Sequence, residues 1–359
     1  MLTAMKLIVD CAVCTRAGGI FGSQGSLAGG SVAIVLVSLN GVTQVQTGQW
    51  GIVFFAARET PQAIRRSVDA ALLAAPGPAT IDVMVNGSLP LADALTQGWM
   101  APDTGLPQVR IRVWSIPHGD KANAWNQYVH HIWSSESLAF FLDGYVQPRQ
   151  DALILLGQAV SGRAAALGGS GVPTQGRSAS TLRANFLVNG GFHGNLCCIK
   201  GDVLQRLKQR NIRLPVGLYR TDSLMGALLA YDLDPSTRAW DDDRIVVHPE
   251  ATWRFDAKPG WHIATLQGHW SRRQRQARGA LENAAFSNHL AKRRLLPEQL
   301  PPEAKELVLN WVRMCPADAQ RVLRFHPLRW WALRKLREQQ PVDYAVPLPV
   351  LRWDSSAQP

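Results

Sequence analysis

The chain has 359 residues, of which 46% are hydrophobic and 18% are charged, and its formal net charge at pH 7 is +11. This composition is typical of a globular protein and excludes a disordered or collagen-like chain. The longest apolar runs are shorter than the roughly 18 residues that a membrane-spanning helix needs, so we expect no transmembrane segment.

The positive charge lies mainly in the C-terminal third of the chain. From Arg244 onward there are 19 Lys and Arg against 10 Asp and Glu, a net charge of +9, whereas the first 243 residues carry a net charge of +2. Such a field favours anionic partners: pyrophosphate, anionic lipid or nucleic acid. No zinc-finger, RNP-like or helix-turn-helix pattern is present, so we do not expect nucleic acid to be the partner.

Five cysteines, an odd number, argue against a disulfide framework and favour a reducing compartment. Cys197 and Cys198 are adjacent in a predicted strand, so their side chains should point to opposite faces of the sheet. We therefore expect a cytoplasmic protein, peripheral at the inner face of the membrane if it binds there.

The first 47 residues are small and Gly/Ser-rich, and they predict a flexible lead-in. From Gln49 onward, strand and helix patterns alternate. The predicted strands are Gly51–Ala56, Ile81–Val85, Val109–Trp114 and Leu138–Leu142. The predicted helices are 61–75, 121–133 and 151–160. This rhythm indicates an α/β domain over residues 48–260, with a mostly parallel sheet flanked by helices and a ligand at the carboxyl ends of the strands.

After the predicted helix at residues 151–160, the pattern is less regular. Residues 161–185 are rich in Gly, Ser, Arg and Thr and predict a loop or an irregular hairpin, while Phe192–Ile199 and Arg244–His248 predict further strands. Residues 261–359 form a basic, Trp-containing region that we expect to be helical. A helix break is expected at Pro297–Pro302, and the tail after Gln340 is expected to be extended.

Polar residues follow the first two predicted strands. Arg58 and Glu59 come after the first strand, and Asn86-Gly87-Ser88 ends the second. The Asn86 side chain can hydrogen-bond a base or a ribose but brings no charge. The alternative is a plain turn, because Asn-Gly is a common turn dipeptide.

Lys121 stands at the start of the predicted helix that follows the third strand, in the segment Gly119–Asn126. A lysine at a helix N-terminus adds a positive charge where backbone N–H groups already favour phosphate. Asn126 follows about one turn later and can brace the loop. The alternative is a surface lysine in an ordinary first turn.

In their order and spacing, these motifs resemble those of the nucleotide-sugar-dependent glycosyltransferases of family 2. The resemblance covers roughly residues 48–280 and implies a GT-A-type fold. It places Arg58, Glu59 and Asn86 at the nucleotide, although the family usually has an acidic residue at the position of Asn86. Lys121, in a segment similar to Gly-Lys-x-x-Ala-Leu-Asn, would lie near the diphosphate, although Asp120 is inserted and Trp125 replaces Leu.

The resemblance also places Asp143-Gly144-Tyr145 at the family's Asp-x-Asp, where two carboxylates hold a Mn²⁺ or Mg²⁺ ion that bridges the diphosphate oxygens. Here Tyr145 replaces the second carboxylate, and it can hydrogen-bond the diphosphate but cannot neutralise it. Three outcomes stay open. Asp143 holds the metal with a further ligand such as His193 or His248, basic residues supply the charge instead, or the protein is not a catalyst.

Two further motifs complete the resemblance. The segment Trp270–Gly279 corresponds to Gln-x-x-Arg-Trp followed by Gly, which would place Arg275 near the diphosphate, although a solvated basic helix face is the alternative. Asp222 corresponds to the carboxylate that takes the proton of the acceptor in inverting enzymes. The alternative for Asp222 is a helix N-cap, and the two roles are compatible.

The segment Phe325–Arg337 mixes aromatic and basic residues. It could lie on an anionic membrane surface and present a lipid-linked acceptor to the site. The alternative is a packed terminal helix with a solvated basic face.

The resemblance implies an inverting glycosyltransferase of polysaccharide biosynthesis that moves a sugar from a nucleotide diphosphate, for which a UDP-sugar is expected, to a glycan or a lipid-linked acceptor. The alternative is a catalytically silent relative that binds nucleotide or glycan as a partner subunit. Tyr145 replaces the second carboxylate of Asp-x-Asp, and Gln276 replaces the Trp of Gln-x-x-Arg-Trp. Both changes favour this alternative.

Overall fold

The computed structural model describes residues 49–75, 77–97, 109–175, 179–256, 263–340 and 348–357. The expected lead-in over residues 1–47 lies outside the described residues, as does the boundary expected at residues 260 and 261. Residues from Thr47 to Pro359 belong to one structural unit, which is described below.

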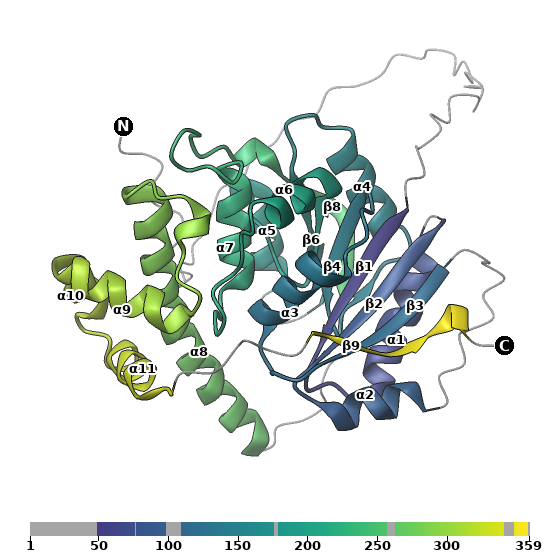
Figure 1. Ribbon diagram of the computed structural model, residues 1–359, viewed down its shortest axis with the longest axis horizontal. Helices are drawn as coiled ribbons and strands as arrows, with labels where there is room; N and C mark the ends of the chain where they lie inside the picture. Colours follow the sequence, from purple (N-terminus) through teal and green to yellow (C-terminus); the bar gives the residue numbers. More distant parts are fainter. Residues whose placement is uncertain are drawn as a thin grey trace, which may run out of the picture. The chain divides into compact units, whose positions relative to one another are not determined.

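Parallel strands form the centre of the sheet (Figure 1). Strand β1 (Trp50–Ala56) pairs in parallel with β2 (Ala79–Asn86) on one side and with β4 (Leu138–Asp143) on the other. Strand β3 (Val109–Ile116) continues the parallel pairing beyond β2. These strands and the helices on both faces confirm the predicted α/β architecture.

The described strands form a sheet in the order β5-β8-β6-β7-β4-β1-β2-β3-β9. The outer strands are β5 (Gln147–Pro148), β6 (Gly168–Pro173), β7 (Leu196–Lys200), β8 (Ile245–Arg254) and β9 (Val350–Asp354). Strand β7 runs antiparallel to β4 and to β6, whereas β6 and β8 are parallel. Strand β9 pairs antiparallel with β3, so part of the tail expected to be extended forms an edge strand.

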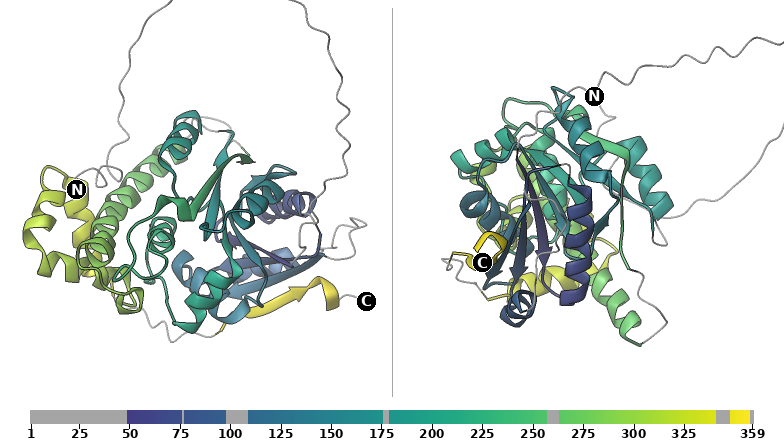
Figure 2. Two further views of the ribbon diagram at one scale, coloured as in Figure 1. Left: turned by 90° about the horizontal axis from the view of Figure 1, so that it is seen from above. Right: turned by 90° about the vertical axis from the view of Figure 1, so that its right-hand side faces the viewer.

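Helices cover both faces of the sheet, as Figure 2 shows from two directions. An apolar core lies on each face. One core contains Ile52 and Phe54, and helices α1 (Pro61–Ala74), α2 (Leu89–Thr96) and α4 (Ala152–Ser161) pack there. The other contains Val53 and Phe55. Because successive strand residues face opposite cores, the central strands are apolar runs without alternation.

The second core also receives most of the remaining helices. These are α3 (Lys121–Gln127), α6 (Gly201–Gln209), α7 (Thr221–Ala230), α8 (Ile263–Ser287), α9 (Ala304–Met314), α10 (Pro316–Leu323) and α11 (Pro327–Glu338). The expected helical character of the C-terminal region is confirmed. A 3₁₀ turn at Pro297–Gln299 lies where the helix break was expected.

The local chemistry of α1 shows why the sequence pattern predicts this helix well. The Thr60 hydroxyl accepts a hydrogen bond from the Ala63 N–H at 3.2 Å. Pro61 occupies the first turn, where a backbone N–H would have no acceptor within the helix. The apolar side chains Ile64 and Val68 are buried on one stripe.

The expectation of a loop or hairpin over residues 161–185 is wrong, because this stretch contains β6 and α5 (Ala179–Asn189). The strand has the unusual sequence Gly-Gly-Ser-Gly-Val-Pro and is fully buried. A Cβ atom on Gly168 would lie 2.6 Å from the Cys198 carbonyl oxygen, and one on Gly169 would lie 2.7 Å from the Val246 carbonyl oxygen. Glycine is needed there because neighbouring backbones approach closely, which strand propensity does not reveal.

Other boundaries differ by a few residues from the sequence predictions. The helix expected over residues 121–133 consists of α3 and a π-helical turn at Tyr128–Ile132. Strand β7 begins at Leu196, not at Phe192, and β8 continues to Arg254. Cys197 and Cys198 belong to opposite cores, as predicted from their adjacency. None of the helices in the described part of the chain combines the length and the apolarity needed to cross a bilayer.

Candidate active site

The carboxyl ends of the central strands lie at one edge of the sheet. The strand register aligns Phe55 of β1 with Asp143 of β4, and Asn86 of β2 with Ile116 of β3. Residues that follow these positions are therefore neighbours, although they are far apart in the sequence.

The side chain of Asn86 mainly stabilises the local structure. Its side-chain oxygen accepts a hydrogen bond from the Asp120 N–H at 2.7 Å, and it is nearly buried. Gly87 has a φ of +76°, and its α-carbon packs against Gly119 so closely that a side chain would collide with that backbone. Asn86-Gly87 thus forms the turn that was one alternative, and it fixes the loop before α3.

Asp120, the inserted residue of the lysine motif, caps α3 and ties it to a distant loop. One of its oxygens accepts a hydrogen bond from the Asn123 N–H at 2.7 Å, and the other accepts one from the Gly217 N–H at 2.9 Å. Burial raises the pKa of Asp120, and the hydrogen bonds from these backbone donors oppose this rise. Asn126 braces the same loop through two hydrogen bonds of 2.8 Å with the backbone of Leu214.

Lys121 and Asp143 form an ion pair at the ends of α3 and β4. The Lys121 Nζ lies 2.5 Å from Asp143 Oδ1, and it also lies 5.7 Å from the centre of the Phe55 ring. Burial lowers the pKa of Lys121, but the carboxylates of Asp143 and Asp222 more than offset this effect, so its pKa is raised. Lys121 therefore remains a cation at neutral pH.

Tyr145 completes the surroundings of Asp143. Its hydroxyl donates a hydrogen bond to Asp143 Oδ2 at 3.1 Å. Burial and the nearby carboxylates of Asp143 and Glu59 raise the pKa of Tyr145, so the phenol remains protonated. Both oxygens of Asp143 thus have a partner within the protein.

Asp222 lies in the first turn of α7 and reaches the same place. Its Oδ2 accepts a long hydrogen bond of 3.4 Å from the Gly194 N–H. A Cβ atom on Gly194 would lie 3.3 Å from both Asp222 Cβ and Lys121 Nζ, so these two side chains meet around this glycine. The N-cap of α7 is Arg220, two residues earlier, so the alternative in which Asp222 is the N-cap is wrong.

The arrangement does not match a metal site held by protein ligands. Within the described residues, no three His, Cys, Asp or Glu side chains gather as a metal-binding group. The ammonium group of Lys121 occupies one oxygen of Asp143 where a cation would bind. These residues therefore do not fit a divalent cation in the geometry that the structure shows.

The two histidines considered as further metal ligands lie in different surroundings. Burial lowers the pKa of His193, against the opposing effect of Asp222 and Asp143, so a neutral imidazole lies near the two carboxylates. The Nδ1 atom of His248 accepts hydrogen bonds from the N–H groups of Glu250 and Ala251, both at 3.2 Å. No contact links His248 to Asp143.

Arg58 and Glu59 follow β1, but they are engaged differently. Glu59 Oε2 accepts hydrogen bonds from the N–H groups of Ala57 and Arg58, at 2.7 and 2.9 Å, and so stabilises its own turn. The Arg58 side chain is exposed. Of this pair, Arg58 is the more exposed side chain.

Arg275 is exposed on α8, and no contact joins it to Lys121, Asp143 or Asp222. Arg278, about one turn later, forms hydrogen bonds within the protein. Arg278 donates hydrogen bonds to Glu282 Oε1 at 2.8 Å and to the Gly217 carbonyl oxygen. The other oxygen of the buried Glu282 accepts from the N–H groups of Tyr219 and Arg220, at 2.9 and 3.1 Å. This buried carboxylate thus positions the loop that leads to Asp222, and local sequence offers no signal for it.

Arg220 is a second residue that sequence reasoning missed as part of the site. Its Nε atom is buried without a hydrogen-bond partner. A Cβ atom on Gly279 would lie only 2.5 Å from that Nε, so the glycine matched in the basic motif makes room for Arg220. This Nε atom is packed against α8, so an anionic ligand could meet only the rest of the guanidinium group, two residues from Asp222.

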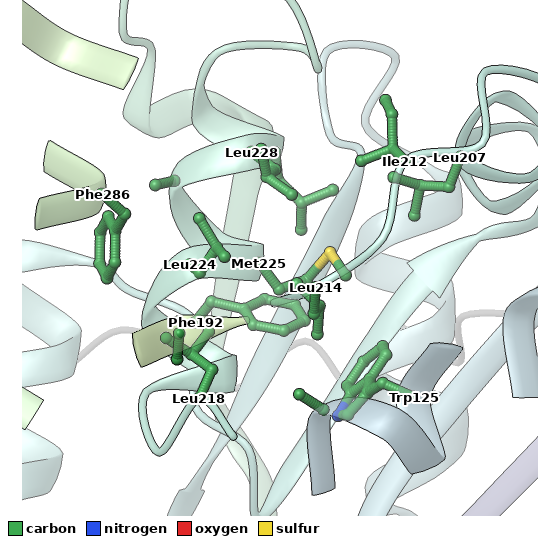
Figure 3. Close-up of a cluster of buried hydrophobic side chains, with 14 of the residues drawn as sticks. Trp125, Phe192, Leu207, Ile212, Leu214, Leu218, Leu224, Met225, Leu228 and Phe286 are labelled. Carbon is green, nitrogen blue, oxygen red and sulfur yellow. The ribbon is translucent and has the colours of Figure 1, made fainter. Parts of the chain in front are cut away.

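An apolar layer holds α3 and α7 together beneath these charges. Figure 3 shows Trp125 of α3 in a cluster with Phe192 and with Leu224, Met225 and Leu228 of α7. Trp125 also stacks on Phe141 of β4, with ring centroids 3.8 Å apart. The Trp that departs from the family motif is therefore a core residue, and it helps to fix the positions of Lys121 and Asp222.

Comparisons with known proteins agree with this architecture. No protein-family model and no curated protein matches the sequence. A mannosyltransferase from Pyrobaculum calidifontis, solved with GDP-Man and Mn²⁺, is similar over 80% of this chain and 84% of its own, with a TM-score of 0.51 and 16% identity. Glucosyl-3-phosphoglycerate synthase from Mycobacterium tuberculosis, solved with Mn²⁺, UDP and glucosyl-3-phosphoglycerate, is similar over 64% of this chain and 78% of its own, with a TM-score of 0.43 and 16% identity. The first likeness shows that the fold is of the GT-A type.

Proposed function

We propose that this protein transfers a sugar from a nucleotide-diphosphate donor to an acceptor hydroxyl with inversion, as a relative of the family 2 glycosyltransferases. The observation that carries the proposal is the meeting of Lys121 and Asp222 around Gly194, with Asp143 paired to Lys121, at the carboxyl ends of the sheet. The mannosyltransferase with a similar fold was solved with GDP-Man, which supports a nucleotide-sugar donor here.

Asp222 is the proposed base. Its carboxylate takes the proton of the acceptor hydroxyl while the acceptor oxygen attacks the anomeric carbon. The bond between that carbon and the diphosphate oxygen breaks, and its electron pair leaves with the diphosphate. The Gly194 N–H and the start of α7 hold the carboxylate in place.

Lys121 is proposed to neutralise the departing diphosphate in place of a metal ion. An ammonium group carries three N–H donors, so Lys121 can keep its bond to Asp143 and still donate to phosphate oxygens. Arg220, two residues from Asp222, is proposed to supply a second cation. Of the three outcomes predicted from the sequence, we favour charge from basic residues. The single O–H of Tyr145 is donated to Asp143, so Tyr145 would hydrogen-bond the diphosphate only after it releases that carboxylate.

The nucleotide is proposed to lie over the ends of β1 and β2. Arg58 is exposed there, and the side-chain NH₂ group of Asn86 remains available to a base or ribose. The Glu59 carboxylate orders the turn that presents Arg58. Arg275 stays a prediction for the diphosphate, and it would require movement of α8 or the ligand toward it.

The donor and acceptor stay predictions from the resemblance. A UDP-sugar is the expected donor, with a GDP-sugar as the alternative that the mannosyltransferase suggests. A glycan or a lipid-linked precursor at the cytoplasmic face is the expected acceptor.

A second candidate function is a silent relative that binds nucleotide or glycan as a partner subunit. The observation that favours it is that both oxygens of Asp143 are already engaged, by Lys121 and Tyr145.

A thermal-shift titration with UDP, GDP, CDP and dTDP, each with and without Mn²⁺, tests donor binding. Binding to the native state raises the melting temperature by mass action. The proposal predicts a rise with one nucleotide that does not depend on Mn²⁺. A rise that requires Mn²⁺ would restore the metal to the site, and no rise with any nucleotide would contradict donor binding.

Transfer assays with the matching nucleotide sugar then separate the two functions. Asp222→Asn should lower the rate of transfer about 10³-fold and leave the melting temperature and nucleotide binding nearly unchanged. Asp202→Asn is the matched control, because Asp202 also lies in the first turn of a helix, α6. Nucleotide binding without transfer by the unaltered protein, over a panel of sugars and acceptors, would support the silent relative.

A further inference from the structure

Three large aromatic side chains are exposed within seven residues of one another, at the junction of α10 and α11 (Figure 1). Phe325 is 84% exposed, Trp330 52% and Trp331 39%. Folded proteins usually cover such side chains, since each has a large apolar surface. This aromatic cluster, Phe325, Trp330 and Trp331, requires an explanation in addition to the fold.

The backbone at Phe325 holds its ring outward. Its φ is +60°, a left-handed conformation that is unfavourable for a bulky residue. The guanidinium group of Arg324 lies over the ring, 4.7 Å from its centroid. An unfavourable conformation that exposes an apolar ring indicates a role at the surface.

Basic residues surround the aromatic cluster without acidic partners in the same stretch. Residues 324–337 contain five Lys and Arg and no Asp or Glu. The side chains of Arg334 and Lys335 are 79% and 58% exposed, and both form ion pairs with Glu338 at the helix end. The surface is therefore cationic as well as apolar.

The exposure is not a sign of a loosely attached helix. Ala332, Leu333 and Leu336 of α11 are buried in the second core, as in the packed terminal helix that was one alternative. On the outer side, Trp330, Trp331, Leu333, Arg334 and Arg337 line an open groove of about 440 Å³. Two indole rings thus face the same groove as two guanidinium groups.

We propose that this surface binds an anionic phospholipid bilayer. Phe325, Trp330 and Trp331 enter the interfacial layer, where aromatic rings are favoured, and Arg334 and Arg337 contact the lipid phosphates. Nucleic acid is disfavoured as the occupant, because Arg324 covers a face of the Phe325 ring that base stacking would need. This inference is independent of the proposed sugar transfer.

Vesicle co-sedimentation of the full chain tests the proposal. We expect binding to vesicles of equal parts phosphatidylcholine and phosphatidylglycerol, weaker binding at high salt, and little binding to phosphatidylcholine alone. The Trp330→Ser/Trp331→Ser double variant should weaken binding to the anionic vesicles by about 100-fold, given the apolar area lost from two indoles. Arg334→Gln/Arg337→Gln should weaken it by about 30-fold, from the two lost charges.

Phe325→Gly separates membrane binding from folding. Glycine adopts the left-handed conformation without strain, so the melting temperature should stay the same or rise, while binding to anionic vesicles falls by about tenfold. Trp240→Ser is the matched control, because Trp240 is 45% exposed at a different site and should not affect vesicle binding.

The proposal is overturned if anionic vesicles do not bind the protein, or if the aromatic and arginine variants bind them as tightly as the unaltered protein. It is equally overturned if both vesicle types bind alike, since the charges would then have no role. A single-stranded RNA oligonucleotide that binds through the same residues, with no vesicle binding, would reassign the surface to nucleic acid.

Discussion

Asp82 and Asp143 have similar partners at two places in the same sheet. Each carboxylate is paired with one cation and accepts a hydrogen bond from one aromatic side chain. Asp82 lies in the middle of β2, where Arg112 and the Trp114 N–H both contact it at 2.7 Å. Asp143 lies at the carboxyl end of β4, with Lys121 and Tyr145 as its partners.

The two sites differ in geometry and in access to solvent. Arg112 contacts both oxygens of Asp82, which is fully buried, and Arg112 itself is only 12% exposed. Lys121 contacts a single oxygen of Asp143, and their side chains are 31% and 19% exposed. A bidentate guanidinium in the core has no donor directed to a ligand, whereas an ammonium group at the rim does. The position in the sheet therefore separates a structural pair from a candidate catalytic pair.

The largest expected effect is on folding, at the buried pair. Asp82→Ala leaves the Arg112 guanidinium without its partner in the core, and we expect the free energy of unfolding to fall by about 3–5 kcal/mol. Urea denaturation measures this loss. Asp93→Ala removes the partner of Arg352 in an exposed ion pair and should cost less than about 1 kcal/mol. Similar losses for the two variants would contradict the structural role of Asp82.

At the Lys121–Asp143 pair, the effect should be on the reaction and not on folding. We expect Lys121→Met to lower kcat/KM for sugar transfer by about 10²–10³-fold, or roughly 3–4 kcal/mol, while the free energy of unfolding changes by less than about 1 kcal/mol. Lys208→Met is the control, because Lys208 also lies over an aromatic ring, that of Trp133, at 6.0 Å. If Lys121→Met unfolded the protein as readily as Asp82→Ala does, the distinction between the two pairs would fail.

A change at Glu282 should affect both stability and activity, because Glu282 is fully buried and also holds the loop before Asp222. In Glu282→Gln, the new NH₂ group must face either Arg278 or the backbone donors of Tyr219 and Arg220. We expect a loss of about 2 kcal/mol of stability and about a tenfold fall in kcat/KM. Denaturation and transfer assays measure the two effects, and Glu298→Gln, in a more exposed pair with Arg210, should change neither appreciably. Unchanged activity with reduced stability would limit Glu282 to a folding role.

The smallest effect concerns His130, a half-buried group that has no acidic partner among the described residues. Burial and Arg213 lower its pKa to about 4, and its Nε2 contacts the Ile212 carbonyl oxygen at 3.0 Å. Because the unfolded chain takes up a proton near pH 6.5 and the native state does not, this group reduces stability as the pH falls from 6.5 toward 4.

Gln can donate to the same carbonyl but does not titrate, so His130→Gln should be less sensitive to acid. Between pH 6.5 and pH 4 we expect the unaltered protein to lose on the order of 1 kcal/mol more than the variant, after allowance for solvent exposure. Thermal denaturation at a series of pH values measures the difference. An equal loss in both proteins would contradict the assignment to His130.

The sequence by itself determined the central part of the fold. Apolar runs such as Gly51–Ala56 and the helical stripe after Pro61 are local patterns, and each is set by residues near one another in the chain. The same patterns placed Lys121 and Asp143 beside strand ends. The resemblance to the family 2 glycosyltransferases then named them, together with Asp222, as candidates for one site.

Only the tertiary structure decided which candidates meet and which residues support them. Asp143 is 22 residues from Lys121, and Glu282 is 63 residues from Tyr219, so no local pattern records these contacts. Strand β6 is rich in glycine because the backbones of its neighbours lie too close for side chains. Those neighbours are strands far from β6 in the sequence, so local sequence does not reveal the close approach. Local periodicity reports which face of an element is apolar, whereas pairing between charges depends on where the assembled sheet brings them.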